Sequence, residues 1–109
     1  MKDDLELVMT YRNDFVEWLK EIEIKATNIQ ELGVAHGDQV LYAIFIYTNT
    51  DTNKKEWGVW GGIDYTSPNQ CPITIAGRET DREHNYDILD DAREELYRDW
   101  DIPVKEFLL

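Results

Sequence analysis

The longest apolar run of the chain lies within residues 39–65, which read QVLYAIFIYTNTDTNKKEWGVWGGIDY. Residues 39–48 are almost all apolar and rich in β-branched and aromatic side chains, which is typical of a strand covered on both faces. Residues 49–55 are polar turn formers. Residues 56–65 alternate between two faces, with glycines inserted. The segment therefore predicts a β-hairpin whose first strand is the central strand of a sheet.

Trp57 and Trp60 fall on opposite faces of the predicted second strand. Packing is the favoured explanation, with helices on the two sheet faces or glycines making room for bulky neighbours. A partner contact and a small-ligand site beside Trp60 and Asp64 remain open. The run GVWGG at residues 58–62 lies inside a strand pattern, so it does not predict a phosphate-binding loop.

An amphipathic helix is predicted from residue 3 to about residue 25, before the hairpin. Its apolar stripe consists of Leu5, Val8, Phe15, Leu19 and Ile22. The end of this helix is open on two alternatives. It runs on to Leu32 with Gly33 as the stop, or it breaks near Thr27 and Asn28.

A short strand and a second helix are predicted after the hairpin. Residues 73–77 are predicted to form an edge strand. The apolar stripe of the second helix consists of Leu89, Ala92, Leu96 and Trp100. This helix ends before Asp101, and Thr80 or Asn85 is its expected N-cap. The tail, residues 104–109, is either a short strand or a helical turn.

These elements predict one small α+β domain over residues 1–109. It has an N-terminal helix, a three- or four-stranded antiparallel sheet, and a C-terminal acidic helix packed on the sheet. The predicted order is helix, strand, strand, strand, helix, with the tail as a candidate fourth strand.

The formal net charge is −12 for 109 residues. A surface this negative repels nucleic acid and anionic lipid and attracts basic proteins. The first thirty residues contain no continuous apolar stretch, so we expect no signal peptide. No apolar run is long enough to cross a membrane, and Cys71 is the single cysteine. We therefore expect a cytoplasmic protein with a basic protein partner, no direct nucleic-acid binding and no membrane contact. A homodimer stays open.

Candidates for catalysis and metal binding are few. Cys71, His36 and His84 lack the spacing of a zinc site. Cys71 also sits in an acidic chain, which opposes the pKa lowering that a nucleophilic thiol needs, and Ser67 has no nucleophile-elbow sequence around it. The sequence predicts no metal, no cofactor and no enzymatic activity.

The second helix carries like-charged pairs four residues apart, each costing a few tenths of a kcal/mol. Carboxylates one turn apart repeat at about 5–6 Å, close to the roughly 7 Å spacing of phosphates along a nucleic-acid strand. This similarity is the physical basis of nucleic-acid mimicry. A solvated face that only keeps the protein soluble is the competing interpretation. The predicted partner-binding residues are Asp87, Asp90, Asp91, Glu94, Glu95, Asp99, Trp60 and Asp64.

The leading functional hypothesis is a small acidic protein that inhibits a basic, nucleic-acid-handling partner. In size, charge and element order the chain resembles small immunity and phage-encoded inhibitor proteins, a similarity that no family motif carries. Such a resemblance implies an anti-restriction, anti-CRISPR or toxin-immunity role. The alternative is a small-molecule-binding or regulatory module that uses Trp60 and Asp64. A small hydrolase is least favoured, because no nucleophile and base can be paired.

Overall fold

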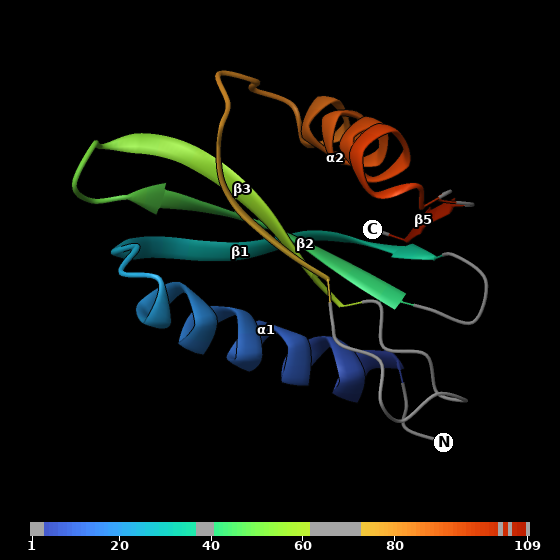
Figure 1. The fold of residues 1–109 in the computed structure, drawn as a ribbon, viewed down its shortest axis with the longest axis horizontal. Helices are drawn as coiled ribbons and strands as arrows, with labels where there is room; N and C mark the ends of the chain where they lie inside the picture. Colours follow the sequence, from blue (N-terminus) through green and yellow to red (C-terminus); the bar gives the residue numbers. More distant parts are fainter. Residues whose placement is uncertain (1–3, 37–40, 62–72, 103, 105, 109) are drawn as a thin grey trace.

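The computed structural model describes residues 4–36, 41–61, 73–102, 104 and 106–108 (Figure 1). It consists of two helices and five strands. In chain order these are α1 (Asp4–Glu21), β1 (Ala26–His36), β2 (Leu41–Asn49), β3 (Lys54–Gly61), β4 (Ile73–Glu79), α2 (Asn85–Trp100) and β5 (Glu106–Leu108).

The strands form one sheet in the order β4-β3-β2-β1-β5, and each pair of neighbours is antiparallel. The strand predicted as central, β2, occupies the middle of this order, and the strand predicted at residues 73–77 lies at an edge as β4. The small α+β domain is thus confirmed. The sheet exceeds the expected three or four strands because β1 was not predicted.

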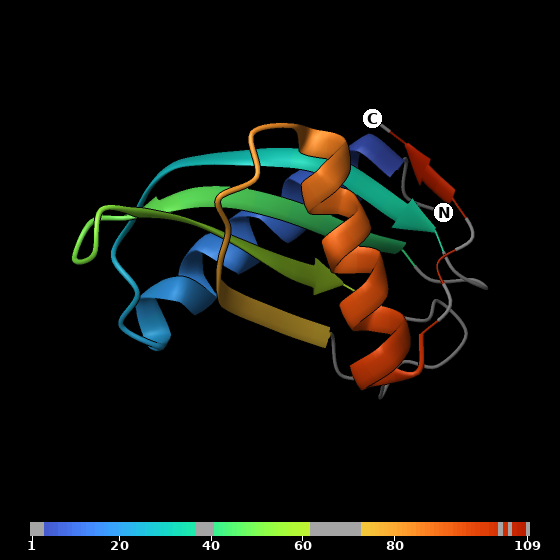
Figure 2. The same ribbon diagram turned by 90° about the horizontal axis from the view of Figure 1, so that it is seen from above.

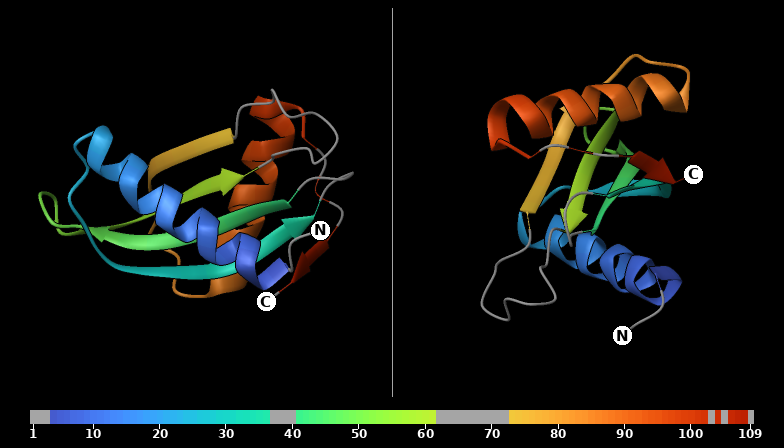
Figure 3. Two further views of the ribbon diagram at one scale, coloured as in Figure 1. Left: turned by 90° about the horizontal axis from the view of Figure 1, so that it is seen from below. Right: turned by 90° about the vertical axis from the view of Figure 1, so that its right-hand side faces the viewer.

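The two helices cover opposite faces of the sheet, as the end-on view shows (Figure 3). The α1 face buries a core built on Tyr11, Phe15, Leu19, Phe45 and Tyr47. The α2 face buries a second core, which includes Tyr42, Ile44, Trp57, Val59, Ile75, Ile88, Leu89, Ala92 and Leu96. Because β2 sends alternate side chains to each core, it is apolar from Tyr42 to Tyr47.

The predicted hairpin is the β2–β3 pair, in register from Tyr42 opposite Gly61 to Asn49 opposite Lys54. In its turn, the Asn49 side chain accepts a hydrogen bond from the Asp51 backbone N–H at 3.0 Å. This local bond is typical of asparagine in turns. Of the predicted return strand, the part beyond residue 61 lies outside the described residues.

The two tryptophans of β3 pack on opposite faces, in line with the favoured packing explanation. Trp57 belongs to the core under α2, and Trp60 packs, half-buried, against the core under α1. Gly58 lies between them, and Phe15 of α1 packs directly over it. The missing side chain at Gly58 lets the helix approach the sheet closely.

The end of α1 corrects the sequence prediction. The helix stops at Glu21, and Glu23 adopts a left-handed conformation with φ 64°. The N–H of Ile24 then donates to the Leu19 carbonyl at 2.9 Å, and that of Glu23 to the Lys20 carbonyl at 3.1 Å. These two bonds form a Schellman motif, which usually has glycine at the left-handed position.

The segment that one of the two alternatives made a helical extension is instead strand β1, so the run to Leu32 was wrong. The helix also ends before Thr27 and Asn28, which lie within β1 and not at the helix end. β1 carries two register irregularities against β2, between Thr27 and Gln30 and between Glu31 and Gly33. As a result Leu32 joins the α2 core while Val34 joins the α1 core. An unbroken strand would place both on one face. The bulges therefore remove the period of two that identifies a strand.

The start of the second helix differs from the sequence prediction, whereas its end agrees with it. It begins at Asn85, and His84 occupies the N-cap position without a side-chain hydrogen bond, so neither expected cap is used. It ends as predicted before Asp101, which is left-handed with φ 56°. Of the two alternatives for the tail, the strand is confirmed by β5, which pairs with β1.

Edge strand β4 contains a bulge opposite Gly58, between the pairs Trp57–Arg78 and Val59–Ile75. At this bulge the Gly77 N–H donates to the Tyr47 hydroxyl at 2.7 Å, and Gly77 has φ 75°. The tyrosine, rather than the neighbouring strand, thus satisfies this backbone group. Such bulges twist an edge away from unwanted strand pairing.

Replacing Tyr47 with phenylalanine is expected to lower the free energy of unfolding by about 1–2 kcal/mol at pH 7, because the Gly77 N–H loses its acceptor. Burial, with a smaller contribution from the Glu56 carboxylate, raises the pKa of Tyr47 well above its usual value. The protonated native form is therefore favoured, and this stability is lost as pH rises from about 10.

Thermal melting between about pH 8 and pH 11 measures this effect. In the Tyr47→Phe variant the loss of stability at alkaline pH should be smaller than in the parent. A part of this loss should remain, because burial also raises the pKa of Tyr42. Tyr86, which is 66% exposed, provides the control Tyr86→Phe, expected to melt like the parent. An alkaline limb that is unchanged in Tyr47→Phe would contradict the assignment.

Candidate functional site

Helix α2 lies across the strands of the sheet (Figure 2). We call the side of the helix that points away from the sheet its outer side. Four of its side chains are buried, namely Ile88, Leu89, Ala92 and Leu96. They recur at spacings of three and four, so they form one stripe on the helix. Trp100 continues that spacing but is 42% exposed at the last position of the helix. The buried stripe is therefore shorter than the predicted one, which included Trp100.

One flank of α2 is held to β4 and the loop after it by ion pairs. Arg78 Nε lies 2.7 Å from Glu95 Oε1, and Arg82 Nε lies 3.3 Å from Asp91 Oδ2. The Glu95 side chain is only 12% exposed, whereas that of Arg78 is 48% exposed. Two of the predicted partner-binding carboxylates therefore already neutralise cations of the protein's own surface.

The other predicted carboxylates of α2 are more open to solvent. Asp90, Glu94 and Asp99 are exposed, and Asp87 is half-buried in the first turn, where the helix dipole favours negative charge. Among the described residues, Asp87 and Asp90 form no ion pair.

Glu94 and Asp99 share one cation, Arg98, at 3.3 and 3.1 Å. The hydrogen bond to Asp99 is the main reason that the pKa of Arg98 is raised, so this side chain stays cationic. All three side chains of this cluster are at least half exposed, so each ion pair contributes little to stability.

Aromatic side chains join these carboxylates on α2. Tyr86 is 66% exposed, Tyr97 is 65% exposed, and with Trp100 they are the exposed aromatic residues among those whose side chains the structure describes. The sequence prediction missed the tyrosines because it followed charge and the buried stripe. Their spacing was the available signal: eleven residues, about three helical turns, place Tyr86 and Tyr97 on one side.

Of the two remaining predicted site residues, the described one, Trp60, is not brought to α2. Trp60 lies on the opposite sheet face, where its ring centroid is 6.0 Å from that of Trp18 of α1. Its indole Nε1 is buried and has no hydrogen-bond partner in the described part of the chain. Asp64 lies outside the described residues, as does Cys71. The proposed Trp60 and Asp64 face therefore stays a prediction.

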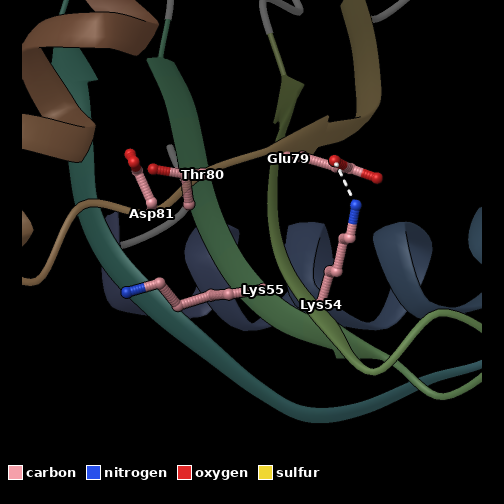
Figure 4. Close-up of a pocket in the computed structure, with 5 residues that line it drawn as sticks. All are labelled: Lys54, Lys55, Glu79, Thr80 and Asp81. Carbon is pink, nitrogen blue, oxygen red and sulfur yellow. Dashed lines mark hydrogen bonds and ion pairs between the residues drawn. The ribbon is translucent and has the colours of Figure 1, made fainter.

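A separate hollow of about 470 Å³ lies where the β2–β3 hairpin meets the end of β4 (Figure 4). It is lined by Lys54, Lys55, Glu79, Thr80 and Asp81. Lys54 Nζ lies 3.3 Å from Glu79 Oε2, and Lys55 Nζ donates to the Arg82 carbonyl. Both ammonium groups thus have acceptors within the protein, which leaves this hollow without a strong anion site.

Within the described ranges, neither α1 nor α2 combines the length and apolar character of a bilayer-crossing helix. No three histidine, cysteine or acidic side chains converge as metal ligands in the same ranges. Among the residues with described side chains, the outer side of α2 combines exposed tyrosines, Tyr86 and Tyr97, with the exposed carboxylates of Asp90 and Glu94. The chain matches no family model, no curated protein and no solved structure.

Proposed function

We propose that this protein is a small acidic inhibitor that binds a basic, nucleic-acid-handling protein through the outer side of α2. The observation that carries the proposal is the pair of exposed tyrosines on the outer side of α2, Tyr86 and Tyr97, interleaved with exposed carboxylates. A helix that served only solubility would have no need of exposed aromatic rings, whose exposure costs free energy. Tyrosine and tryptophan are enriched in protein interfaces.

Charge supports a basic partner. The net charge of −12 acts at long range, and α2 alone carries six acidic and two basic residues. Such a field raises the rate of encounter with a positively charged surface. Proteins that bind nucleic acid contact its phosphates through positively charged surfaces. The expected partner is therefore a nuclease of the kind that anti-restriction, anti-CRISPR and toxin-immunity proteins block.

The outer carboxylates are better suited to imitate phosphates than the flank that faces β4. Asp91 and Glu95 are engaged by arginines of the domain, whereas Asp87 and Asp90 have no ion pair in the described residues and Glu94 is held only by an exposed one. Asp90 and Glu94 are one helical turn apart, about 6 Å along the axis. We therefore assign the contact to Asp87, Asp90 and Glu94.

The test is inhibition of a panel of purified restriction, CRISPR-effector and toxin nucleases, measured by displacement of a fluorescent duplex. The triple variant Asp87→Asn, Asp90→Asn, Glu94→Gln should inhibit at least about tenfold less than the parent, because the charged contacts are lost. It leaves the Arg78 and Arg82 ion pairs intact. Inhibition by the parent should also weaken steeply as salt rises.

The matched control removes three carboxylates from α1, on the opposite side of the sheet, through Asp14→Asn, Glu17→Gln and Glu21→Gln. Both triple variants carry the same net charge, so a nonspecific field would affect them equally. Equal loss in the two variants would overturn the assignment to α2. Failure of the parent to inhibit any nuclease of the panel would overturn the nucleic-acid-handling partner.

A further inference from the structure

A hollow of about 510 Å³ lies between α2 and Val104, the residue that precedes the short strand β5 by two positions. Its lining combines two carboxylates, an aromatic ring, a cation and an apolar side chain, from Asp90, Glu94, Tyr97, Arg93 and Val104. Asp90, Glu94 and Tyr97 are spaced by four and three residues, which places them on one side of the helix.

The aromatic wall of this hollow is open to an incoming group. Tyr97 is 65% exposed, so its ring is not buried in the core. An exposed ring face attracts cations through its quadrupole, and a guanidinium group also stacks on it as a flat plate. This feature is independent of the carboxylates beside it.

The carboxylates of Asp90 and Glu94 are available to an incoming cation. Asp90 forms no ion pair among the described residues. The pair between Glu94 and Arg98 spans 3.3 Å with side chains that are 70% and 62% exposed, so it holds Glu94 only weakly. Arg93 offsets part of the negative charge at the hollow. Asp87, which is half-buried and lies one helical turn before Asp90, adds to that negative charge.

Arginine fits these groups better than lysine. A guanidinium presents several N–H donors in one plane, so it can bridge two carboxylates a helical turn apart while stacking on a tyrosine ring. Its three-carbon stem can lie against an apolar surface such as that of Val104. An ammonium group is a more strongly hydrated point charge and gains less from the ring.

We propose that the hollow between α2 and Val104 receives an arginine side chain of the basic partner, held by Asp90 and Glu94 and stacked on Tyr97. This assignment rests on the proposed function and refines it. It makes the helix selective for arginine-bearing surfaces rather than for positive charge in general.

The test compares fluorescein-labelled nona-arginine and nona-lysine peptides, which have equal charge, by fluorescence anisotropy with the 109-residue chain. The arginine peptide should bind about tenfold tighter in about 150 mM salt. In Tyr97→Ala this preference should fall below about threefold, chiefly through weaker arginine binding. Asp90→Asn should weaken the binding of both peptides, and it should weaken the binding of the arginine peptide more.

Two control variants make the readout specific. Tyr86→Ala removes an equally exposed tyrosine that belongs to the proposed interface but does not line the hollow, so it should lower the affinities for both peptides by the same factor and leave their ratio unchanged. Glu21→Gln removes one carboxylate from α1, on the opposite sheet face. Both should keep the arginine preference, and circular dichroism verifies that every variant is folded.

Equal affinities of the parent for the two peptides would overturn the arginine site, as would an equal loss of preference in Tyr86→Ala and Tyr97→Ala. These outcomes are separate from those of the nuclease panel. If the parent inhibits a nuclease but does not prefer the arginine peptide, only the assignment of the hollow as an arginine site is refuted. A parent that prefers arginine but inhibits no nuclease retains the hollow and refutes the nucleic-acid-handling partner.

Discussion

Gly58→Ala is expected to lower the free energy of unfolding by about 3 kcal/mol, the upper part of the range for an overpacked core. A Cβ atom at this position would collide with the Ile75 carbonyl oxygen of β4 and lie 2.7 Å from Cζ of the Phe15 ring. The carbonyl belongs to the backbone, and Phe15 is fully buried, so neither can move aside cheaply. Urea unfolding followed by tryptophan fluorescence measures the loss.

Gly77→Ala is the matched control, because it adds the same methyl group on the adjacent strand. Gly77 has φ 75°, but the nearest atom to an added Cβ is the Ile24 Cδ1 at 4.0 Å. Only the left-handed backbone is then unfavourable, which costs about 1–2 kcal/mol. A Gly58→Ala variant no less stable than Gly77→Ala would refute the steric argument.

Phe15→Ala is expected to lower the free energy of unfolding by about 4 kcal/mol, as for other buried phenylalanines. The Phe15 ring stacks on Phe45 with centroids 4.7 Å apart, and its centroid lies 6.0 Å from that of Tyr47. Its removal leaves a cavity between α1 and the centre of the sheet. Met9→Ala, at a 60% exposed position of the same helix, should change stability by less than about 0.5 kcal/mol.

The two substitutions should also be coupled. In the Phe15→Ala background the ring contacts of an added Cβ at Gly58 vanish, while the Ile75 contact remains. Gly58→Ala should therefore cost less there than in the parent, by about 1 kcal/mol in a double-mutant cycle. Strict additivity would show that Gly58 and Phe15 do not constrain one another.

The sequence was sufficient for elements whose apolar pattern has an undisturbed period. The run that became β2, the alternation around Trp57 and Trp60, and the stripe of α2 all led to the observed elements. β1 was missed because its bulges send Leu32 and Val34 to opposite cores and destroy its alternation. Glu23 stands where glycine would have signalled the end of α1.

The candidate site shows the same division between local and long-range information. The acidic row of α2 is a local property, so the sequence alone identified it. The engagement of Asp91 and Glu95 depends on Arg82 and Arg78, which lie 9 and 17 positions away in the sequence. Such contacts form only in three dimensions, so charge counting could not separate these carboxylates from Asp90 and Glu94.

The strand order has a consequence for how the molecule assembles. β1 to β4 each pair with their neighbour in the sequence, so that part can form by successive short loop closures. β5 instead pairs His36 with Glu106 and must close a loop of 70 positions, which costs more chain entropy. We therefore expect β5 to dock late and to bring Val104 against α2 at that step. The hollow would then distinguish a fully folded chain from a partly folded one.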